Sequence, residues 1–352
     1  MLTDLTRERY EIFARHVRRP EMSGRWLVLT HDNPDPDAIA AAAVLGTVLR
    51  RTFKRRVTTA YGGIIGRAEN QEMVKTLGIR LSHVRHLTFR HYRHFALVDA
   101  QPATGNTQLP EGVQPDLVFD HHPLRRSTQK AGFADVRTEY GATATILAEY
   151  LQATGLGFSK RVATALIYAI RSETRDFGRE FSAPDKAIFD TLLPLSDFRA
   201  LARIQSPRLP LSYFRTLHHA LEHVQWVSTL VVSDLGVVEQ PDIVPEVADL
   251  LLRLEGKTWS MCSGIFGERL YLSIRTTNPR ADAGRLMQRL LGRTGKGGGH
   301  GMMAGGYIDL TDVTNGDADA VRRRLVRQLA TALKKNPDRL TSMTLTSGGD
   351  AG

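Results

Sequence analysis

Short, continuous apolar runs recur along the first half of the chain, and each leads into a polar segment. The clearest runs are residues 26–30, 95–98 and 117–119. Runs of this length are typical of strands buried on both faces in a parallel sheet. Between the runs, apolar residues recur at helical spacing, which indicates a parallel sheet covered on both faces. The predicted strands are 25–30, 57–61, 95–98 and 117–119, and the predicted helices are 4–18, 38–51, 68–77, 142–153 and 159–171.

The second half of the chain repeats this pattern on a smaller scale. Residues 186–225 are predicted to form a helical linker, because helical spacing continues there between prolines. Residues 226–338 then indicate a smaller α/β domain, and the small, polar residues 339–352 are expected to be disordered. The predicted strands of this smaller domain are 227–233, 259–266, 270–276 and 307–310, and its predicted helices are 245–254, 282–291 and 317–334.

Composition narrows the class of protein. With 42% hydrophobic and 24% charged residues, the chain of 352 residues is typical of a soluble protein of two domains. No apolar stretch is long enough to span a membrane, and the N-terminal residues lack the apolar centre of a signal peptide. The single cysteine, Cys262, excludes an internal disulfide. These features predict a cytoplasmic protein that does not bind membranes.

The net charge of +10 favours anionic substrates or partners. Arginine dominates the basic residues and is scattered along the chain, without a basic tail. Two histidine-rich segments, 83–94 and 218–223, have no further ligand at metal-binding spacing, so we interpret them as surface segments.

Metal-ligand residues follow three of the apolar runs. They are His31, Asp35 and Asp37 after the first, Asp99 after the second, and Asp120, His121 and His122 after the third. Because ligands bind at the carboxyl ends of the strands in open α/β sheets, the three clusters would meet at one edge. Separately, they have ordinary interpretations: Asp37 would cap the helix 38–51, and Asp99 would be a loop residue. Together they predict a metal site.

The types of ligand limit the choice of metal. A structural zinc site built from cysteines is excluded, because these clusters contain no thiolate. Carboxylates mixed with imidazoles suit Mn, Fe or Zn, and a carboxylate-rich site favours Mn or Mg. The ligands suffice for two ions, and two ions about 3.5–4 Å apart can clamp a phosphoryl group during its displacement.

Four motifs resemble those of one enzyme family. HDNPDPDA, the strand ending LVD, and FDHHP resemble the first three motifs of the DHH phosphoesterase superfamily. GKGGGHGMMAGG resembles the glycine–histidine signature of the type-one DHH-associated domain. The resemblance extends from about residue 25 to 310 and is nearest to the nano-RNase (oligoribonuclease) and pAp phosphatase branch. It implies a DHH catalytic domain at 1–185, an associated substrate-binding domain at 226–338, and an active site in the cleft between them.

The resemblance also implies which residues hold metal. His31 and Asp35 would bind one divalent ion, and Asp37 and His121 would bind the other. Asp99 would bridge the two ions. The family most often uses Mn, with Mg, Co or Fe as alternatives.

The remaining site residues are two neighbours of His121 and a fourth motif that departs from the family pattern. By resemblance, Asp120 would orient its neighbours, and His122 would contact the scissile phosphate or assist the leaving oxygen. The fourth family motif usually supplies an aspartate, but here Glu173 stands at that register and would be the last ligand of the second ion. Asp176 is the alternative.

The glycine–histidine segment is expected to be a loop that binds the non-reacting end of a nucleotide. Consecutive glycines allow backbone N–H groups to approach an anion, although a tight turn between a helix and a strand would have the same composition. An arginine on the strand 270–276 would hold phosphate in a bidentate manner. The expected substrate contacts are Arg275, Lys296, Gly297, Gly298, Gly299 and His300.

The activity implied by the resemblance is the hydrolysis of short RNA or DNA oligonucleotides to mononucleotides, by a hydroxide that two metal ions activate. Conversion of pAp to AMP is a further expected activity, and a homodimer is expected from the family alone. One alternative is a phosphodiesterase for cyclic di-AMP or linear pApA. The other is a scaffold that binds no metal, which the complete set of ligands disfavours.

Overall fold

The computed structural model describes residues 2–178, 180–312 and 317–343. The chain divides into two compact units, and the boundary between them along the sequence falls between Pro207 and Arg208. Each unit has its own hydrophobic core, as expected for two domains.

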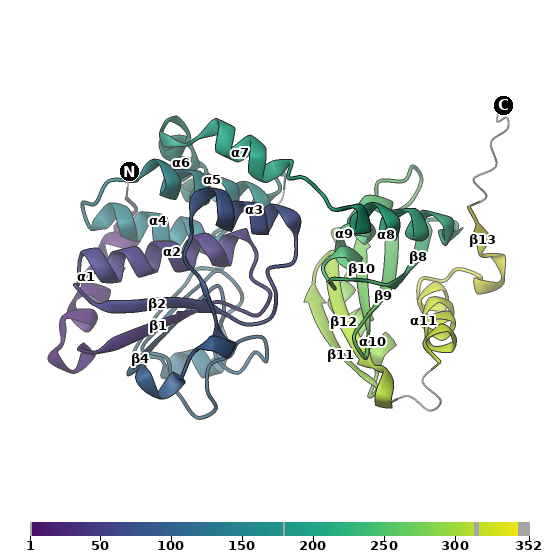
Figure 1. Ribbon diagram of the computed structural model, residues 1–352, viewed down its shortest axis with the longest axis horizontal. Helices are drawn as coiled ribbons and strands as arrows, with labels where there is room; N and C mark the ends of the chain where they lie inside the picture. Colours follow the sequence, from purple (N-terminus) through teal and green to yellow (C-terminus); the bar gives the residue numbers. More distant parts are fainter. Residues whose placement is uncertain (1, 179, 313–316, 344–352) are drawn as a thin grey trace. The chain divides into compact units, whose positions relative to one another are not determined.

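The first unit contains a six-stranded sheet in the order β3-β2-β1-β4-β5-β6 (Figure 1). All neighbouring strands are parallel, which confirms the parallel sheet predicted from the apolar runs. The strands that carry the three ligand clusters, β1, β4 and β5, are consecutive neighbours in the middle of the sheet. The strands are β1 (Arg25–Leu29), β2 (Arg56–Tyr61), β3 (Ser82–His83), β4 (His94–Val98), β5 (Leu117–Asp120) and β6 (Phe133–Val136).

The two faces of this sheet are covered differently. Alternate strand residues such as Trp26, Val28 and Phe119 pack against helices, and Figure 1 shows these helices on one side of the sheet. The opposite face, with Leu27 and Leu29, is covered by loops and 3-10 turns between β3 and β6. Both faces are therefore covered, but only one by α-helices. The helices are α1 (Asp4–Arg18), α2 (Pro36–Arg51), α3 (Ala68–Leu77), α4 (Thr143–Ala153), α5 (Lys160–Thr174), α6 (Ala183–Leu192) and α7 (Phe198–Gln205).

The second unit contains a seven-stranded sheet in the order β11-β12-β10-β9-β8-β7-β13. It is antiparallel except for the pair β8 and β9. The strands are β7 (Gln225–Val227), β8 (Leu230–Val237), β9 (Trp259–Phe266), β10 (Arg269–Thr276), β11 (Gly295–His300), β12 (Met303–Asp309) and β13 (Thr341–Ser342). The helices are α8 (Leu211–Glu222), α9 (Ile243–Leu251), α10 (Ala283–Leu291) and α11 (Ala318–Ala332).

Two predicted segments differ in the structure. The glycine-rich segment expected as a loop is a hairpin, in which Gly297 pairs with Gly306 and Gly298 with Gly305. Part of the segment expected to be disordered forms β13, which pairs with β7, whereas 344–352 lie outside the described residues. Within the described ranges, no helix is long and apolar enough to cross a membrane.

Candidate metal centre

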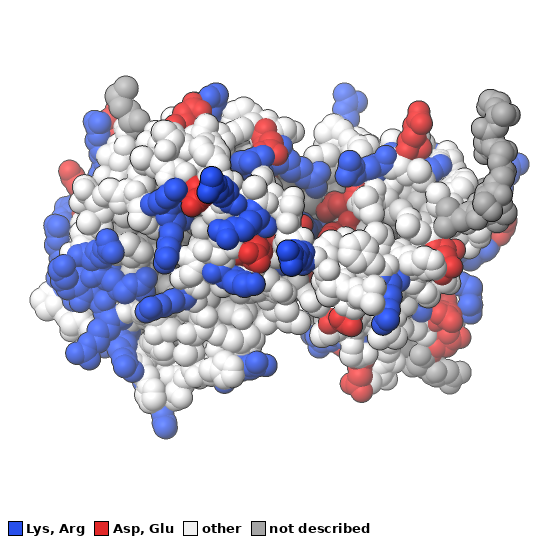
Figure 2. Space-filling view, turned by 45° about the horizontal axis from the view of Figure 1, so that its top comes forward, with Lys and Arg blue, Asp and Glu red and all other residues white. Residues whose placement is uncertain are grey.

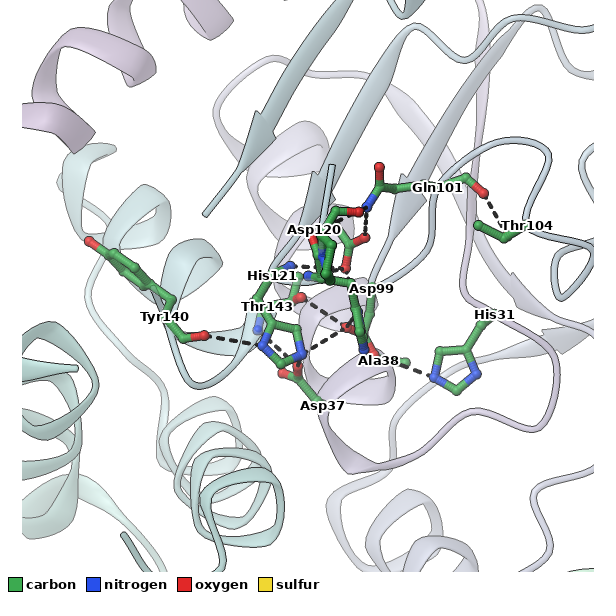
Figure 3. A network of polar contacts seen from close by, with 12 residues as sticks. His31, Asp37, Ala38, Asp99, Gln101, Thr104, Asp120, His121, Tyr140 and Thr143 are labelled. Atoms are coloured by element: carbon green, nitrogen blue, oxygen red, sulfur yellow. Dashed lines mark hydrogen bonds and ion pairs between the residues drawn. The ribbon is translucent and has the colours of Figure 1, made fainter. Parts of the chain in front are cut away.

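The carboxyl ends of β1, β4 and β5 bring the three predicted clusters together (Figure 3). His31 lies just after β1, Asp99 just after β4, and Asp120 ends β5. Two groups have ligand atoms within 4.8 Å of one another: His31, Asp35 and Asp99 in one, and Asp99, His121 and His122 in the other. Asp99 belongs to both groups, so its carboxylate lies between two sets of potential ligands.

The Asp99 side chain is directed by its backbone and by one hydrogen bond. Its φ angle of +53° is in the left-handed region, which few residues other than glycine adopt. The Thr143 hydroxyl donates to its Oδ1 at 2.9 Å. Its Oδ2 then lies 3.4 Å from His31 Nε2, and its Oδ1 lies 3.7 Å from His121 Nε2. The two carboxylate oxygens therefore face different imidazoles.

The predicted helix cap at Asp37 is wrong. Helix α2 begins two residues earlier than predicted, at Pro36, and Asp35 is the N-cap, whose side chain accepts from Ala38 N–H at 3.0 Å. The buried Asp37 carboxylate instead accepts the N–H groups of Thr143 at 2.8 Å and Ala144 at 2.6 Å. Asp37 thus satisfies the amino end of α4, whose own N-cap residue provides no side-chain acceptor.

His31 and His121 are held in the same manner. Nδ1 of His31 lies 2.8 Å from the Asp32 carbonyl oxygen, and Nδ1 of His121 lies 3.1 Å from that of Tyr140. A carbonyl can only accept, so each Nδ1 donates its proton to that carbonyl, and each Nε2 is directed toward the carboxylates of the site. This is the arrangement typical of histidines that bind metal.

His122 is held differently from the other two histidines. Its Nδ1 lies 2.8 Å from Oδ1 of the buried Asp120, and 42% of its side chain is exposed. Burial alone would lower the pKa of His122, but the hydrogen bond with Asp120 and the charge of Asp99 raise it to about 9. The structure therefore presents a cationic, partly exposed imidazole at the edge of the site.

Gln101 is a buried residue of the site that we did not predict. Its Nε2 donates to Asp120 Oδ2 at 2.6 Å and to the Pro123 carbonyl oxygen at 3.1 Å. Its Oε1 accepts from Arg125 N–H and from the Thr128 hydroxyl, both at 2.7 Å. Gln101 therefore joins the loop after β4 to the loop after β5, and Figure 3 shows it beside Asp120.

Negative charge is concentrated at this edge, where the basic groups that face Asp35, Asp37 and Asp99 in the described residues are imidazoles. In the described residues, no Lys or Arg lies within 4.0 Å of the Asp35, Asp37 or Asp99 carboxylates. Burial raises the pKa of Asp37 well above its usual range, and the charges of Asp99, Asp35 and Glu173 add to the effect. A divalent cation would supply the missing positive charge, and the oxygen and imidazole donors suit such an ion. The residues present therefore fit a divalent metal.

The environment of the fourth motif distinguishes its two candidates. Glu173 lies in the last turn of α5, and its charge raises the pKa of both Asp37 and His122. Asp176 is 66% exposed and forms an ion pair with Arg171. The electrostatic contact with the site favours Glu173, although its role as a ligand stays a prediction.

The predicted substrate contacts of the second unit lie on β10 and β11. Arg275 is buried, and its Nε donates to Asp249 Oδ1 at 3.0 Å. Its Nη1 donates to the carbonyl oxygens of Ile274 at 3.0 Å and Ala304 at 3.2 Å. The guanidinium is therefore held by protein groups, and its contact with phosphate stays a prediction.

Glycine allows β11 to lie close to its neighbours. A Cβ atom on Gly284 of α10 would lie 2.1 Å from the Gly299 carbonyl oxygen, and one on Gly297 would lie 2.5 Å from a Leu291 methyl carbon. Lys296 and Gly298 lie on the same strand, which is the edge of its sheet. The side chain of His300 lies outside the part of the chain that the structure describes.

Two family models match the chain in the expected order. The model of the DHH family N-terminal domain matches residues 25–170, and the model of the DHHA1 domain matches residues 228–338. The chain belongs to the DHH superfamily of phosphoesterases. The first match covers His31, Asp99 and the Asp-His-His segment, so the candidate metal centre lies within the DHH domain.

The chain is also similar to two known proteins, one in sequence and one in fold. An uncharacterized protein of Methanocaldococcus jannaschii, MJ1633, is 36% identical over 286 residues. The alignment covers 81% of this chain, and the chain spans 58% of the length of that relative. An exopolyphosphatase-related protein from Bacteroides fragilis has the same fold, with a TM-score of 0.71 at 14% identity over 95% of this chain and 99% of that one.

Proposed function

We propose that this DHH phosphoesterase hydrolyses short oligonucleotides, down to dinucleotides, to mononucleotides with the aid of two divalent ions. We expect Mn, with Mg, Co or Fe as alternatives. The observation that supports the proposal most is the Asp99 carboxylate, which lies between two groups of potential ligands. When bound, the ions would supply Lewis acidity and lower the pKa of a water nucleophile.

The ligands would divide between two ions around Asp99. We propose His31 and Asp35 for one ion, and His121 and Asp37 for the other. The observed hydrogen bonds support these roles, because they fix the orientation of each side chain. In each case an atom that could bind a metal ion faces the other proposed ligands. Such orientation in advance reduces the cost of assembling the site during the reaction.

His122 would act on the substrate and not on the metal. Its Nδ1 is engaged with Asp120, which favours the protonated imidazole, and its side chain is partly exposed. A cation in this position can donate a hydrogen bond to a phosphate oxygen or to the leaving oxygen. Asp120 would hold the imidazole in place, and Gln101 would hold Asp120.

The second unit would bind the end of the nucleotide that does not react. Edge strand β11 contains three consecutive glycines beside Lys296, so its backbone can approach an anion closely. Arg275 would add a phosphate contact only if its hydrogen bond with Asp249 were exchanged or shared.

The first experiment is a comparison of three substrates: a 5′-phosphorylated RNA dinucleotide, pAp and cyclic di-AMP, each with Mn and with chelator. Fast Mn-dependent release of mononucleotides from the dinucleotide would support the proposal, and the rate on pAp would test the second activity. Preference for cyclic di-AMP would contradict it and favour a cyclic dinucleotide phosphodiesterase. Absence of turnover, together with absence of Mn binding, would favour a scaffold.

A further inference from the structure

The positive charge of the protein is concentrated in two short segments. Residues 15–25 and 49–56 contain eight arginines, one lysine and one glutamate, so they carry +8 of the net charge of +10. The rest of the chain is nearly balanced, at +2. Along the sequence the arginines are spread out, but most of the excess charge is confined to these two segments.

The fold places the two segments side by side. Arg25 and Arg56 are partners in the register of the parallel strands β1 and β2. Arg18, at the end of α1, lies over the ring of Phe53, with its guanidinium carbon 5.7 Å from the ring centre. Arg55 donates to the carbonyl oxygen of Val17. The end of α1, the end of α2 and the starts of β1 and β2 therefore form one surface.

We call this surface the basic edge. Figure 2 shows Lys and Arg side chains gathered over the left end of the first unit, where β1 and β2 begin in Figure 1. All but the half-buried Arg55 are exposed. The basic edge consists of Arg15, Arg18, Arg19, Arg25, Arg50, Arg51, Lys54, Arg55 and Arg56.

These cations are close together and are not neutralised. In the described part of the chain, none of them forms an ion pair with a carboxylate within 4.0 Å. Partial desolvation of its guanidinium lowers the pKa of Arg50, and the charges of Arg51 and Arg80 lower it further. Such mutual repulsion is unfavourable in the absence of an anion, so the surface is suited to bind a ligand with many negative charges.

The basic edge is separate from the candidate metal centre. Helix α2 begins beside Asp35 and ends at Arg51, and its 16 residues give a length of roughly 24 Å. The parallel strands also run from the basic edge to the metal centre, so the two sites lie at opposite edges of one sheet. A ligand on the basic edge does not occupy the reaction centre.

Two features favour nucleic acid over a membrane as the ligand. Arginine outnumbers lysine eight to one, and the planar guanidinium matches phosphate in a bidentate manner. None of the exposed large hydrophobic side chains lies in residues 15–25 or 49–56, so the surface offers no side chain for insertion into lipid. We propose that the basic edge binds the phosphate backbone of a nucleic acid chain, at a surface separate from the candidate metal centre.

The test measures binding of an RNA of about twenty nucleotides, with a fluorescent label and terminal phosphorothioate linkages, to the full chain with Mn over a series of salt concentrations. The variant is Arg51→Gln/Arg56→Gln. We expect its affinity to fall at least fivefold, and the slope of log affinity against log salt to decrease by about one to two, as for the loss of two phosphate contacts. Dinucleotide hydrolysis should change less than twofold.

The matched control is Arg323→Gln/Arg324→Gln, which removes two exposed arginines from α11 of the second unit. Its RNA affinity should change less than twofold. Equal losses in both variants would overturn the proposal, because they would show a general effect of net charge. Unchanged RNA binding in Arg51→Glu/Arg56→Glu, with an intact thermal transition, would also overturn it. Binding to anionic vesicles but not to RNA would replace nucleic acid with a membrane surface.

Discussion

Each of the two edges of the first sheet gathers charges of one sign, but the acidic groups at one edge are buried and the basic groups at the other are exposed. At the carboxyl edge, Asp37 and Asp99 are buried and are held by Thr143 and by backbone N–H groups. At the amino edge, arginines such as Arg51 and Arg56 are exposed to solvent. Repulsion between buried charges is strong because little water screens it, whereas water and salt weaken it between exposed charges. One edge is therefore suited to a small, highly charged ion and the other to a long, flexible polyanion.

Loss of the shared ligand should have the largest effect. Asp99→Asn retains the shape of the side chain and its contact with Thr143, but it removes the charge between the two ligand groups. We expect turnover of the dinucleotide to fall at least a thousandfold, a typical loss when transition-state stabilisation by a metal centre is disrupted. Single-turnover kinetics would measure it. His121→Ala should have a similar effect, and unchanged activity in either variant would remove that residue from the ligand set.

The fourth motif should have an intermediate effect on turnover. Glu173→Gln should reduce kcat by about tenfold to a hundredfold, the range typical of a weakened metal site. Asp176→Asn is the matched control, since that carboxylate is exposed and paired with Arg171. We expect less than a threefold change for it. A larger loss in Asp176→Asn than in Glu173→Gln would reverse the assignment.

The buried charges should also be visible in stability. In the presence of chelator, Asp99→Asn should raise the free energy of unfolding by about 1 kcal/mol. We expect the relief of repulsion with Asp37, together with the better tolerance of a positive φ by asparagine, to outweigh the lost attraction to His31 and His122. Mn should stabilise the wild type by about 2–3 kcal/mol at a hundred times its dissociation constant, and the variant by much less. Thermal unfolding with and without Mn measures both. A variant that is less stable in chelator would contradict this account of the acidic edge.

The smallest change in stability is expected for substitutions at the basic edge. Arg51→Gln/Arg56→Gln should raise the free energy of unfolding by only about 0.2–0.5 kcal/mol at low salt, because exposed charges interact weakly. The gain should disappear at high salt. Denaturant unfolding at two salt concentrations measures it. A gain as large as that of Asp99→Asn would remove the contrast between the two edges.

The strands and the meeting of the three clusters could be predicted because they depend on local signals. An apolar run indicates a buried strand, and parallel strands present their carboxyl ends at one edge. Residues whose roles depend on distant contacts could not be found in this way. Gln101 and Thr143 resemble ordinary loop and helix residues until the fold brings them to Asp120 and Asp99.

The errors have the same origin. Asp37 was expected to cap its own helix, but its carboxylate is closer to α4, which no local pattern reveals. The glycine segment was expected as a loop because glycine favours turns, yet the close packing of Gly297 against Leu291 and Gly305 requires glycine within a strand. The basic edge was overlooked because its two segments are far apart in the sequence and meet only when β1 pairs with β2.

The hydrogen bonds between Asp37 and α4 also bear on when, during synthesis of the chain, the metal centre can form. The hydrogen bonds from Thr143 and Ala144 span 106 and 107 residues. During synthesis, His31, Asp35, Asp37, Asp99 and His121 all leave the ribosome before α4 exists. A nascent chain that stops short of α4 therefore carries nearly every candidate ligand but lacks Thr143 and Ala144, which orient Asp37 and Asp99. Tight metal binding would then become possible only after α4 has formed, so that incomplete chains would stay inactive.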